Sequence, residues 1–224
     1  MAILLCPSMA CADVSALGEQ TRVLETAGAD IFHMDISDGR FLPEMALGLH
    51  DVRCVRRHTQ ACVDVHLYVY EPLRHIEAYA RAGADLLYIH PQSCADPMRC
   101  LVAVRMQGRK AGLSLLPGTQ LETVWELLHA SDALMINTAL GGAPGRAFWT
   151  PILDKVRAAL AFRKAHRLSF PILVDGAITQ QRMEQLAGWG VDGFVLGTQA
   201  LFTGPEVDLA ARMAELRRIV PCEA

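Results

Sequence analysis

The sequence Phe32-His33-Met34-Asp35-Ile36-Ser37-Asp38-Gly39 joins an apolar run to a loop. The run that leads into it, residues 29–32, holds a single charge. This order predicts a buried β-strand that ends in a loop at the glycine. His33 and Asp35 are two residues apart, so on a strand their side chains point to the same face. Taken alone, such a pair is typical of a structural hydrogen bond, although an imidazole beside a carboxylate also suits a divalent metal.

Composition indicates a globular protein with a sizeable core. The chain has 224 residues, of which 52% are hydrophobic and 20% charged, and this length is ordinary for one β/α barrel. A net charge of −3 and a pI near 6.2 give no electrostatic reason to expect nucleic acid or an anionic membrane as a partner. Neither a signal-peptide pattern nor an apolar run of membrane-spanning length is found, so we expect a cytoplasmic location.

The seven cysteines are odd in number and include no Cys-x-x-Cys pair. This spacing argues against a disulfide framework and against a thiolate zinc site, and it favours reduced cytosolic thiols. Cys6 and Cys62 lie in apolar runs, and we expect them to fill the core.

Short apolar runs alternate with amphipathic segments along the whole chain, and helix-stop glycines precede many of the runs. This alternation predicts a single (β/α)8 TIM barrel over residues 1–224, with a doubly wound sheet as the alternative. The predicted strands are 3–6, 31–35, 62–69, 86–89, 110–115, 133–137, 172–174 and 193–196, and the predicted helices are 15–27, 49–58, 73–81, 97–107, 121–129, 151–166, 179–187 and 205–218.

A short sequence motif recurs before the second, fourth and eighth predicted strands, at residues 26–30, 81–85 and 188–192. Each copy has a glycine two residues before an aspartate, and the aspartate directly precedes the strand. Reuse of one αβ turn is expected of a quasi-symmetric barrel, and a doubly wound sheet would not need eight units at this length.

Polar side chains are predicted where several strands end, and a TIM barrel carries its active site at the carboxyl ends of its strands. Each has a structural explanation by itself, but together they form a set of two histidines and two aspartates that suits Zn, Fe, Mn or Co. The set is His33, Asp35, His66 and Asp175. Asp64 and Asp38 are expected to support ligands rather than to bind the ion, and His90 is expected to be structural.

Glycine-rich turns follow the sixth, seventh and eighth predicted strands. Backbone amides in such turns bind anions, and TIM barrels often hold phosphate after strands seven and eight, so we expect a phosphorylated ligand. The candidate contacts are Gly142, Gly145, Arg146, Gly176, Ala177, Gly197 and Thr198, together with Ser8 after the first strand. Arg146 and Ser8 are equally compatible with structural roles.

The motifs His33-Met34-Asp35-Ile36-Ser37-Asp38-Gly39, Asp64-Val65-His66-Leu67 and Val174-Asp175-Gly176, in this order, resemble the ribulose-phosphate 3-epimerase family over nearly the whole chain. The resemblance implies that His33, Asp35, His66 and Asp175 bind one divalent metal ion. It implies that Asp35 and Asp175 also transfer protons at C3 of a ketose phosphate such as ribulose 5-phosphate, and that the protein forms a homo-oligomer.

The chain departs from the family where methionines usually cover the reacting carbons, because Ser37, Tyr68 and Asn137 occupy those positions. These changes leave open a different substrate, such as allulose 6-phosphate.

Two other functional classes remain: a related phosphate-binding lyase or aldolase, and a protein that only binds a sugar phosphate. The two histidines, and the absence of lysine at any predicted strand end except Lys110, argue against the lyase.

Overall fold

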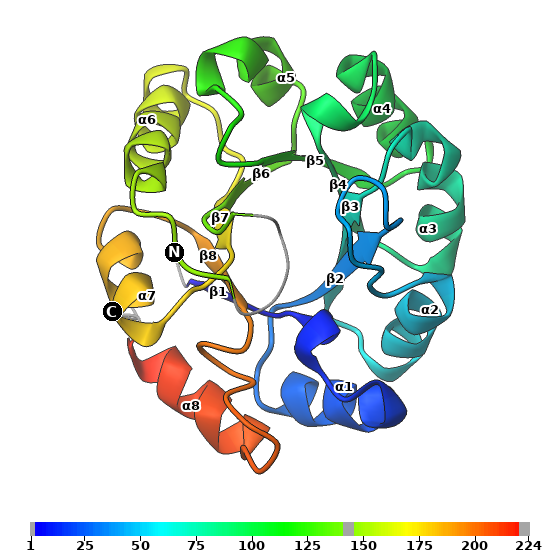
Figure 1. The fold of residues 1–224 in the computed structure, drawn as a ribbon, viewed down its shortest axis with the longest axis vertical. Helices are drawn as coiled ribbons and strands as arrows, with labels where there is room; N and C mark the ends of the chain where they lie inside the picture. Colours follow the sequence, from blue (N-terminus) through cyan, green and yellow to red (C-terminus); the bar gives the residue numbers. More distant parts are fainter. Residues whose placement is uncertain (1–2, 141–145, 220–224) are drawn as a thin grey trace.

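The computed structural model describes residues 3–140 and 146–219 of the chain. Parallel strands pair in the order β1-β8-β7-β6-β5-β4-β3-β2 and form the inner ring of the molecule in Figure 1. The strands are β1 (Leu4–Pro7), β2 (Ile31–Ser37), β3 (Cys62–Tyr68), β4 (Leu86–Ile89), β5 (Lys110–Leu115), β6 (Ala133–Asn137), β7 (Ile172–Asp175) and β8 (Gly193–Leu196). The predicted TIM barrel is confirmed.

The α-helices surround this ring in sequence order (Figure 1) and bury their apolar faces against the strands. They are α1 (Leu17–Thr26), α2 (Leu49–His58), α3 (Ile76–Ala82), α4 (Pro97–Met106), α5 (Trp125–His129), α6 (Ile152–Ala165), α7 (Gln180–Ala187) and α8 (Leu209–Ile219). Among residues 3–140 and 146–219, none of these helices combines the length and hydrophobicity needed to cross a membrane.

Several predicted boundaries are wrong. Helix α3 begins at Ile76 rather than at residue 73, and α5 begins at Trp125 rather than at residue 121, because short 3-10 helices, Pro72–Arg74 and Leu121–Val124, precede them. Strand β2 does not end at Asp35 but continues to Ser37, because Ile36 and Ser37 pair with Leu67 and Tyr68 of β3. The last helix does not begin at Pro205. It begins at Leu209, where the Asp208 carboxylate accepts the backbone N–H of Ala211 at 3.0 Å and so caps the first turn.

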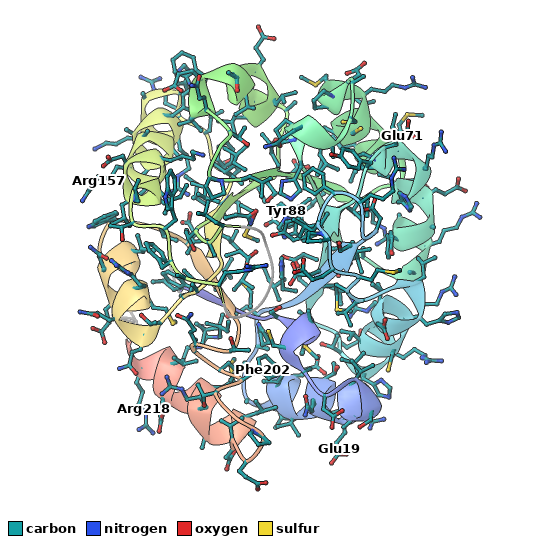
Figure 2. The ribbon with its side chains drawn as sticks, in the orientation of Figure 1. Glu19, Glu71, Tyr88, Arg157, Phe202 and Arg218 are labelled. Carbon is teal, nitrogen blue, oxygen red and sulfur yellow. The ribbon has the colours of Figure 1, made fainter. Side chains whose placement is uncertain are left out.

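Apolar side chains fill the amino-terminal half of the barrel interior. Cys6 belongs to this cluster, and Cys62 packs against it, so the expectation that both fill the core is confirmed. Tyr88 is fully buried and lies near the middle of the ring in Figure 2. Gly112 is its register partner on β5, and a Cβ there would lie 2.3 Å from the Tyr88 ring. The position of the Tyr88 ring therefore requires a glycine at the paired position on β5.

The seam between β1 and β2 closes through few contacts. At the carboxyl end, Ser8 forms an isolated parallel bridge with His33. At the amino end, the Leu5 N–H donates to the Asp30 carboxylate at 2.8 Å. The seam therefore joins Ser8 directly to the strand that carries the predicted site.

Four aspartates, one before each even-numbered strand, tie the barrel together at the amino ends of its strands. Each carboxylate accepts a backbone N–H from the preceding odd-numbered strand and pairs with an arginine from an even-numbered helix. The sets are Asp30 with Leu5 and Arg217, Asp85 with Val63 and Arg56, Asp132 with Ala111 and Arg105, and Asp192 with Ile172 and Arg163. Three of these aspartates are the last residues of the recurring sequence motif, whereas the fourth, Asp132, follows a different turn.

Replacing Asp192 with Asn tests this arrangement. The change removes the charge that pairs with Arg163 and weakens the acceptor for the Ile172 N–H. We expect the free energy of unfolding to fall by about 1.5–3 kcal/mol, since hydrogen bonds to charged groups contribute about this much. Urea denaturation measures the loss.

Asp154→Asn is the matched control. The Asp154 side chain is 89% exposed and pairs with Arg157 one turn away on the surface of α6, so its loss should change stability little. An equal loss in both variants would show that the Asp192 contacts do not stabilise the barrel.

Candidate active site

Four side chains converge at the carboxyl ends of three strands. His33 and Asp35 come from β2, His66 from β3 and Asp175 from β7, and one ligand atom of each lies within 4.8 Å of the others. Both imidazoles are fully buried, while the two carboxylate side chains are 17% and 16% exposed. The structure thus brings together the four residues predicted to bind metal, and two nitrogens with two carboxylate oxygens suit a divalent transition metal.

Strand register orients His33. It pairs with Asp64 across β2 and β3, and its Nδ1 lies 2.7 Å from the buried Asp64 Oδ1. This contact fixes the ring so that Nε2 faces the cluster, 3.0 Å from Asp35 Oδ1. Burial acts to lower the pKa of His33, but the Asp64 and Asp35 carboxylates outweigh it and raise the pKa well above its usual value.

His66 is oriented in a similar way by another histidine. Its Nε2 lies 2.9 Å from Nε2 of His90, and burial holds the pKa of His90 well below its usual value. A neutral His90 can accept the Nε2–H of His66, which directs the Nδ1 lone pair of His66 at the cluster. Among the described residues, this buried Nδ1 has no hydrogen-bond partner; it lies 3.3 Å from Asp35 Oδ1 and 3.9 Å from Asp175 Oδ2. An unpartnered nitrogen here fits a metal ligand.

The two carboxyl groups of the cluster have opposite pKa shifts. Burial opposes ionisation of Asp35, but His33 and His66 outweigh it and hold the pKa of Asp35 far below its usual range. Burial and the charge of Asp35 raise the pKa of Asp175. Environments that separate the pKa values of two nearby carboxyls suit one base and one acid.

Polar side chains contact Asp175 from two of the three positions that the sequence singles out as departures. The Tyr68 hydroxyl donates to Asp175 Oδ2 at 3.3 Å, and the Asn137 amide donates to the same oxygen at 3.3 Å. Ser37, at the third position, instead donates to the Glu44 carbonyl at 2.7 Å. All three side chains therefore make hydrogen bonds, two of which orient Asp175.

A cavity opens above the cluster towards the β7 and β8 loops. Ser8 lines it and donates from Oγ to Asp35 Oδ2 at 3.0 Å. The predicted phosphate contacts Gly176, Ala177, Gly197 and Thr198 also line this cavity. Gly176 has a φ of 104° and Ala177 a φ of 54°, so two successive residues of the turn after β7 have positive φ, a backbone conformation that clusters at ligand-binding sites.

The remaining predicted phosphate contacts lie elsewhere. Arg146 is not among the residues that line this cavity; its half-exposed guanidinium lies 3.4 Å from Glu44 Oε1. Its backbone carbonyl accepts from the Gln199 amide at 3.4 Å, and Gln199 does line the cavity. Gly142 and Gly145 fall outside the described residues.

Sequence reasoning does not find the roles of several residues. It singles out Tyr68 and Asn137 as departures but not their bonds to Asp175, because those bonds join three strands across the barrel. It also misses the contact of His90 with His66, although the place of His90 after β4 is a signal. Asp38 supports the loop after β2 by accepting the backbone N–H groups of Arg40 and Phe41.

Comparison with known proteins agrees with this geometry. Residues 4–202 match the model of the ribulose-phosphate 3 epimerase family. Proteins named ribulose-phosphate 3-epimerase are 35% identical over 205 residues in Synechocystis sp. (91% of this chain, 89% of the relative) and 36% identical over 200 residues in Treponema pallidum (89% and 91%). The chain therefore belongs to the ribulose-phosphate 3-epimerase family, whose members are isomerases acting on carbohydrate phosphates.

Solved structures with the same fold are more distant in sequence. KGPDC from Streptococcus mutans superposes with a TM-score of 0.73 at 12% identity, covering 98% of each chain. A 3-hexulose-6-phosphate synthase superposes with a TM-score of 0.71 at 18% identity, covering 98% of this chain and all of that one. These likenesses concern the barrel fold alone.

Asp64→Asn is expected to weaken metal binding. The amide keeps the size of the side chain but removes the negative charge that orients His33, and loss of such a supporting contact typically lowers metal affinity about 10–100-fold. Titration of the metal-free protein with Zn²⁺ or Mn²⁺, in competition with a coloured chelator, measures the affinity. Asp208→Asn, at the cap of α8, is the control and should leave it unchanged. Equal affinity in the two variants would remove Asp64 from the metal site.

Proposed function

We propose that the protein is a metal-dependent 3-epimerase of a ketose phosphate, of the ribulose 5-phosphate and xylulose 5-phosphate type. The observation that carries this proposal is the convergence of two aspartates and two histidines at the carboxyl ends of β2, β3 and β7. Family membership supports a carbohydrate phosphate as substrate.

Inversion at a carbon beside a ketone requires proton removal on one face and proton return on the other. Asp35 and Asp175 lie on β2 and β7, and in the barrel these strands are separated by β1 and β8. A substrate carbon held between them faces one carboxyl group on each side. The ionised group takes the proton from C3, and the protonated group returns one to the opposite face, with the roles exchanged for the reverse reaction.

The surroundings of the two aspartates suit these roles. The low pKa of Asp35 and the raised pKa of Asp175 favour one ionised and one protonated group. Ser8 holds the second oxygen of Asp35, while Tyr68 and Asn137 hold one oxygen of Asp175. Each carboxyl group is thereby kept in one orientation, which lowers the cost of reaching the reactive geometry.

His33, Asp35, His66 and Asp175 would hold the metal. When bound, a divalent Zn, Fe, Mn or Co ion supplies positive charge that polarises the ketone and offsets the negative charge left when C3 loses its proton. Asp64 and His90 keep the two imidazole nitrogens directed at that position.

The turns after β7 and β8 would bind the phosphate. Gly176 and Ala177 present backbone amides beside the cavity, and a Cβ at Gly176 would lie 2.9 Å from the Ala139 Cβ. Only glycine fits this turn without displacing Ala139. Anchoring the phosphate there places the rest of the sugar above the aspartates.

A larger sugar phosphate, such as allulose 6-phosphate, is the second candidate substrate. A further cavity of about 330 Å³ begins at Asp35 and Tyr68, which line both cavities, and extends past Leu42 and Met45. It offers room for an additional hydroxymethylene group on the side of the cluster away from the β7 and β8 turns. The lyase alternative gains no support, because Lys110 lies at the amino-terminal end of β5 in a cavity at the opposite end of the barrel.

Asp175→Asn is expected to lower turnover by at least about three orders of magnitude, since the change removes both a proton-transfer group and a metal ligand. Coupled assays with ribulose 5-phosphate and allulose 6-phosphate, each with added Zn²⁺, Fe²⁺, Mn²⁺ or Co²⁺, measure the rate. Asp154→Asn, on the surface of α6, is the matched control. Near-full activity of the Asp175 variant would exclude this carboxylate from the mechanism.

Metal removal gives an independent test. Exhaustive dialysis against a strong chelator should abolish epimerisation, and stoichiometric divalent metal should restore it, because a bound divalent cation would polarise the ketone and offset the negative charge left when C3 loses its proton. Metal content is measured on the same samples. A demonstrably metal-free protein with undiminished activity would overturn the metal requirement.

A further inference from the structure

Two cysteines outside the active site lie against each other. The Sγ atoms of Cys94 and Cys100 are 3.4 Å apart, with the Cys100 thiol donating to the Cys94 sulfur. Cys94 lies in the loop that leads into α4, and Cys100 is in the first turns of that helix. A disulfide requires about 2.05 Å between the sulfurs, so a small movement of the loop brings them to bonding distance.

The two sulfurs differ in reactivity. The hydrogen bond from Cys100, with smaller contributions from Ser93 and the Asp96 backbone, lowers the pKa of Cys94 to about 7 despite partial burial. The same contact raises the pKa of Cys100. Burial raises the pKa of Cys11 to about 11 and of Cys62 to about 12. Cys94 is therefore a good nucleophile near neutral pH, and those two thiols are not.

Access also differs between the two sulfurs. Cys94 is partly exposed and lines a surface hollow whose charged lining residues are Glu71, Arg74, Asp96 and Arg99. Cys100 is fully buried behind it. An external reagent therefore meets Cys94 first.

We propose that Cys94 and Cys100 form a redox-active dithiol that closes to an intramolecular disulfide on exposure to a low-molecular-weight disulfide such as oxidised glutathione. The Cys94 thiolate attacks one sulfur of the reagent, its S–S bond breaks, and one glutathione thiolate leaves. The Cys100 sulfur then attacks Cys94, gives up its proton and displaces the second glutathione. The protein loses two electrons and two protons, and the reagent becomes two glutathione thiols.

Thiol counting and peptide mapping test this proposal without any assay of activity. The reduced full chain is incubated with oxidised glutathione, quenched with acid, and alkylated with N-ethylmaleimide under denaturing conditions. Two of the seven cysteines should become protected, and dithiothreitol should restore them. Trypsin cleaves between the pair at Arg99, so the disulfide should join peptides 82–99 and 100–105.

Variants separate the two steps. Cys100→Ser should stop as a mixed disulfide between Cys94 and one glutathione, and Cys94→Ser should leave Cys100 reduced. Cys54→Ser, at another partly exposed cysteine, is the matched control and should behave as the unaltered chain. Seven alkylated thiols in the treated unaltered chain, a linkage between other peptides, or oxidation of Cys94→Ser at an unchanged rate would each overturn the proposal.

Discussion

Closure of the barrel is the constraint on which the rest of the structure depends. Four aspartates at the amino ends of the even-numbered strands each hold a neighbouring strand by its backbone N–H and a helix by an arginine. With these ends fixed, the register of β2 on β3 places His33 beside Asp64 and Asp35 beside His66. Inward-facing residues of a barrel alternate along each strand. The same register therefore directs the side chains of His33, Asp35, Asp64 and His66 into the barrel interior at the carboxyl ends of the strands.

Charged side chains are buried together at the carboxyl ends of the strands. Asp64, His33, Asp35 and His66 form one continuous series of contacts between 2.7 and 3.3 Å, and Asp175 approaches it from β7. Two buried imidazoles and three nearby carboxylates are costly to desolvate unless charge is balanced. A divalent cation bound by four of these groups would provide that balance and would link the stability of the arrangement to the proposed chemistry.

Local pattern predicts most of the fold and the four clustered residues, because strand alternation and the site motifs are contiguous in sequence. The ends of elements depend on distant partners. Pairing with Leu67 and Tyr68 of β3 extends β2 past Asp35, and the Asp208 cap, rather than Pro205, sets the start of α8. The hydrogen bonds of Tyr68 and Asn137 to Asp175 join strands that no local pattern relates, so the sequence indicates altered residues but not their effect.

In the proposed mechanism, Asp35 and Asp175 exchange the C3 proton of a ketose phosphate with solvent. Deuterium incorporation at C3, followed by NMR in heavy water across ketopentose and ketohexose phosphates with added divalent metals, tests it most directly. We expect incorporation at C3 of at least one of these sugars, which would also identify the substrate. Absence of exchange in every sugar, with metal and sugar phosphate shown to bind, would contradict it.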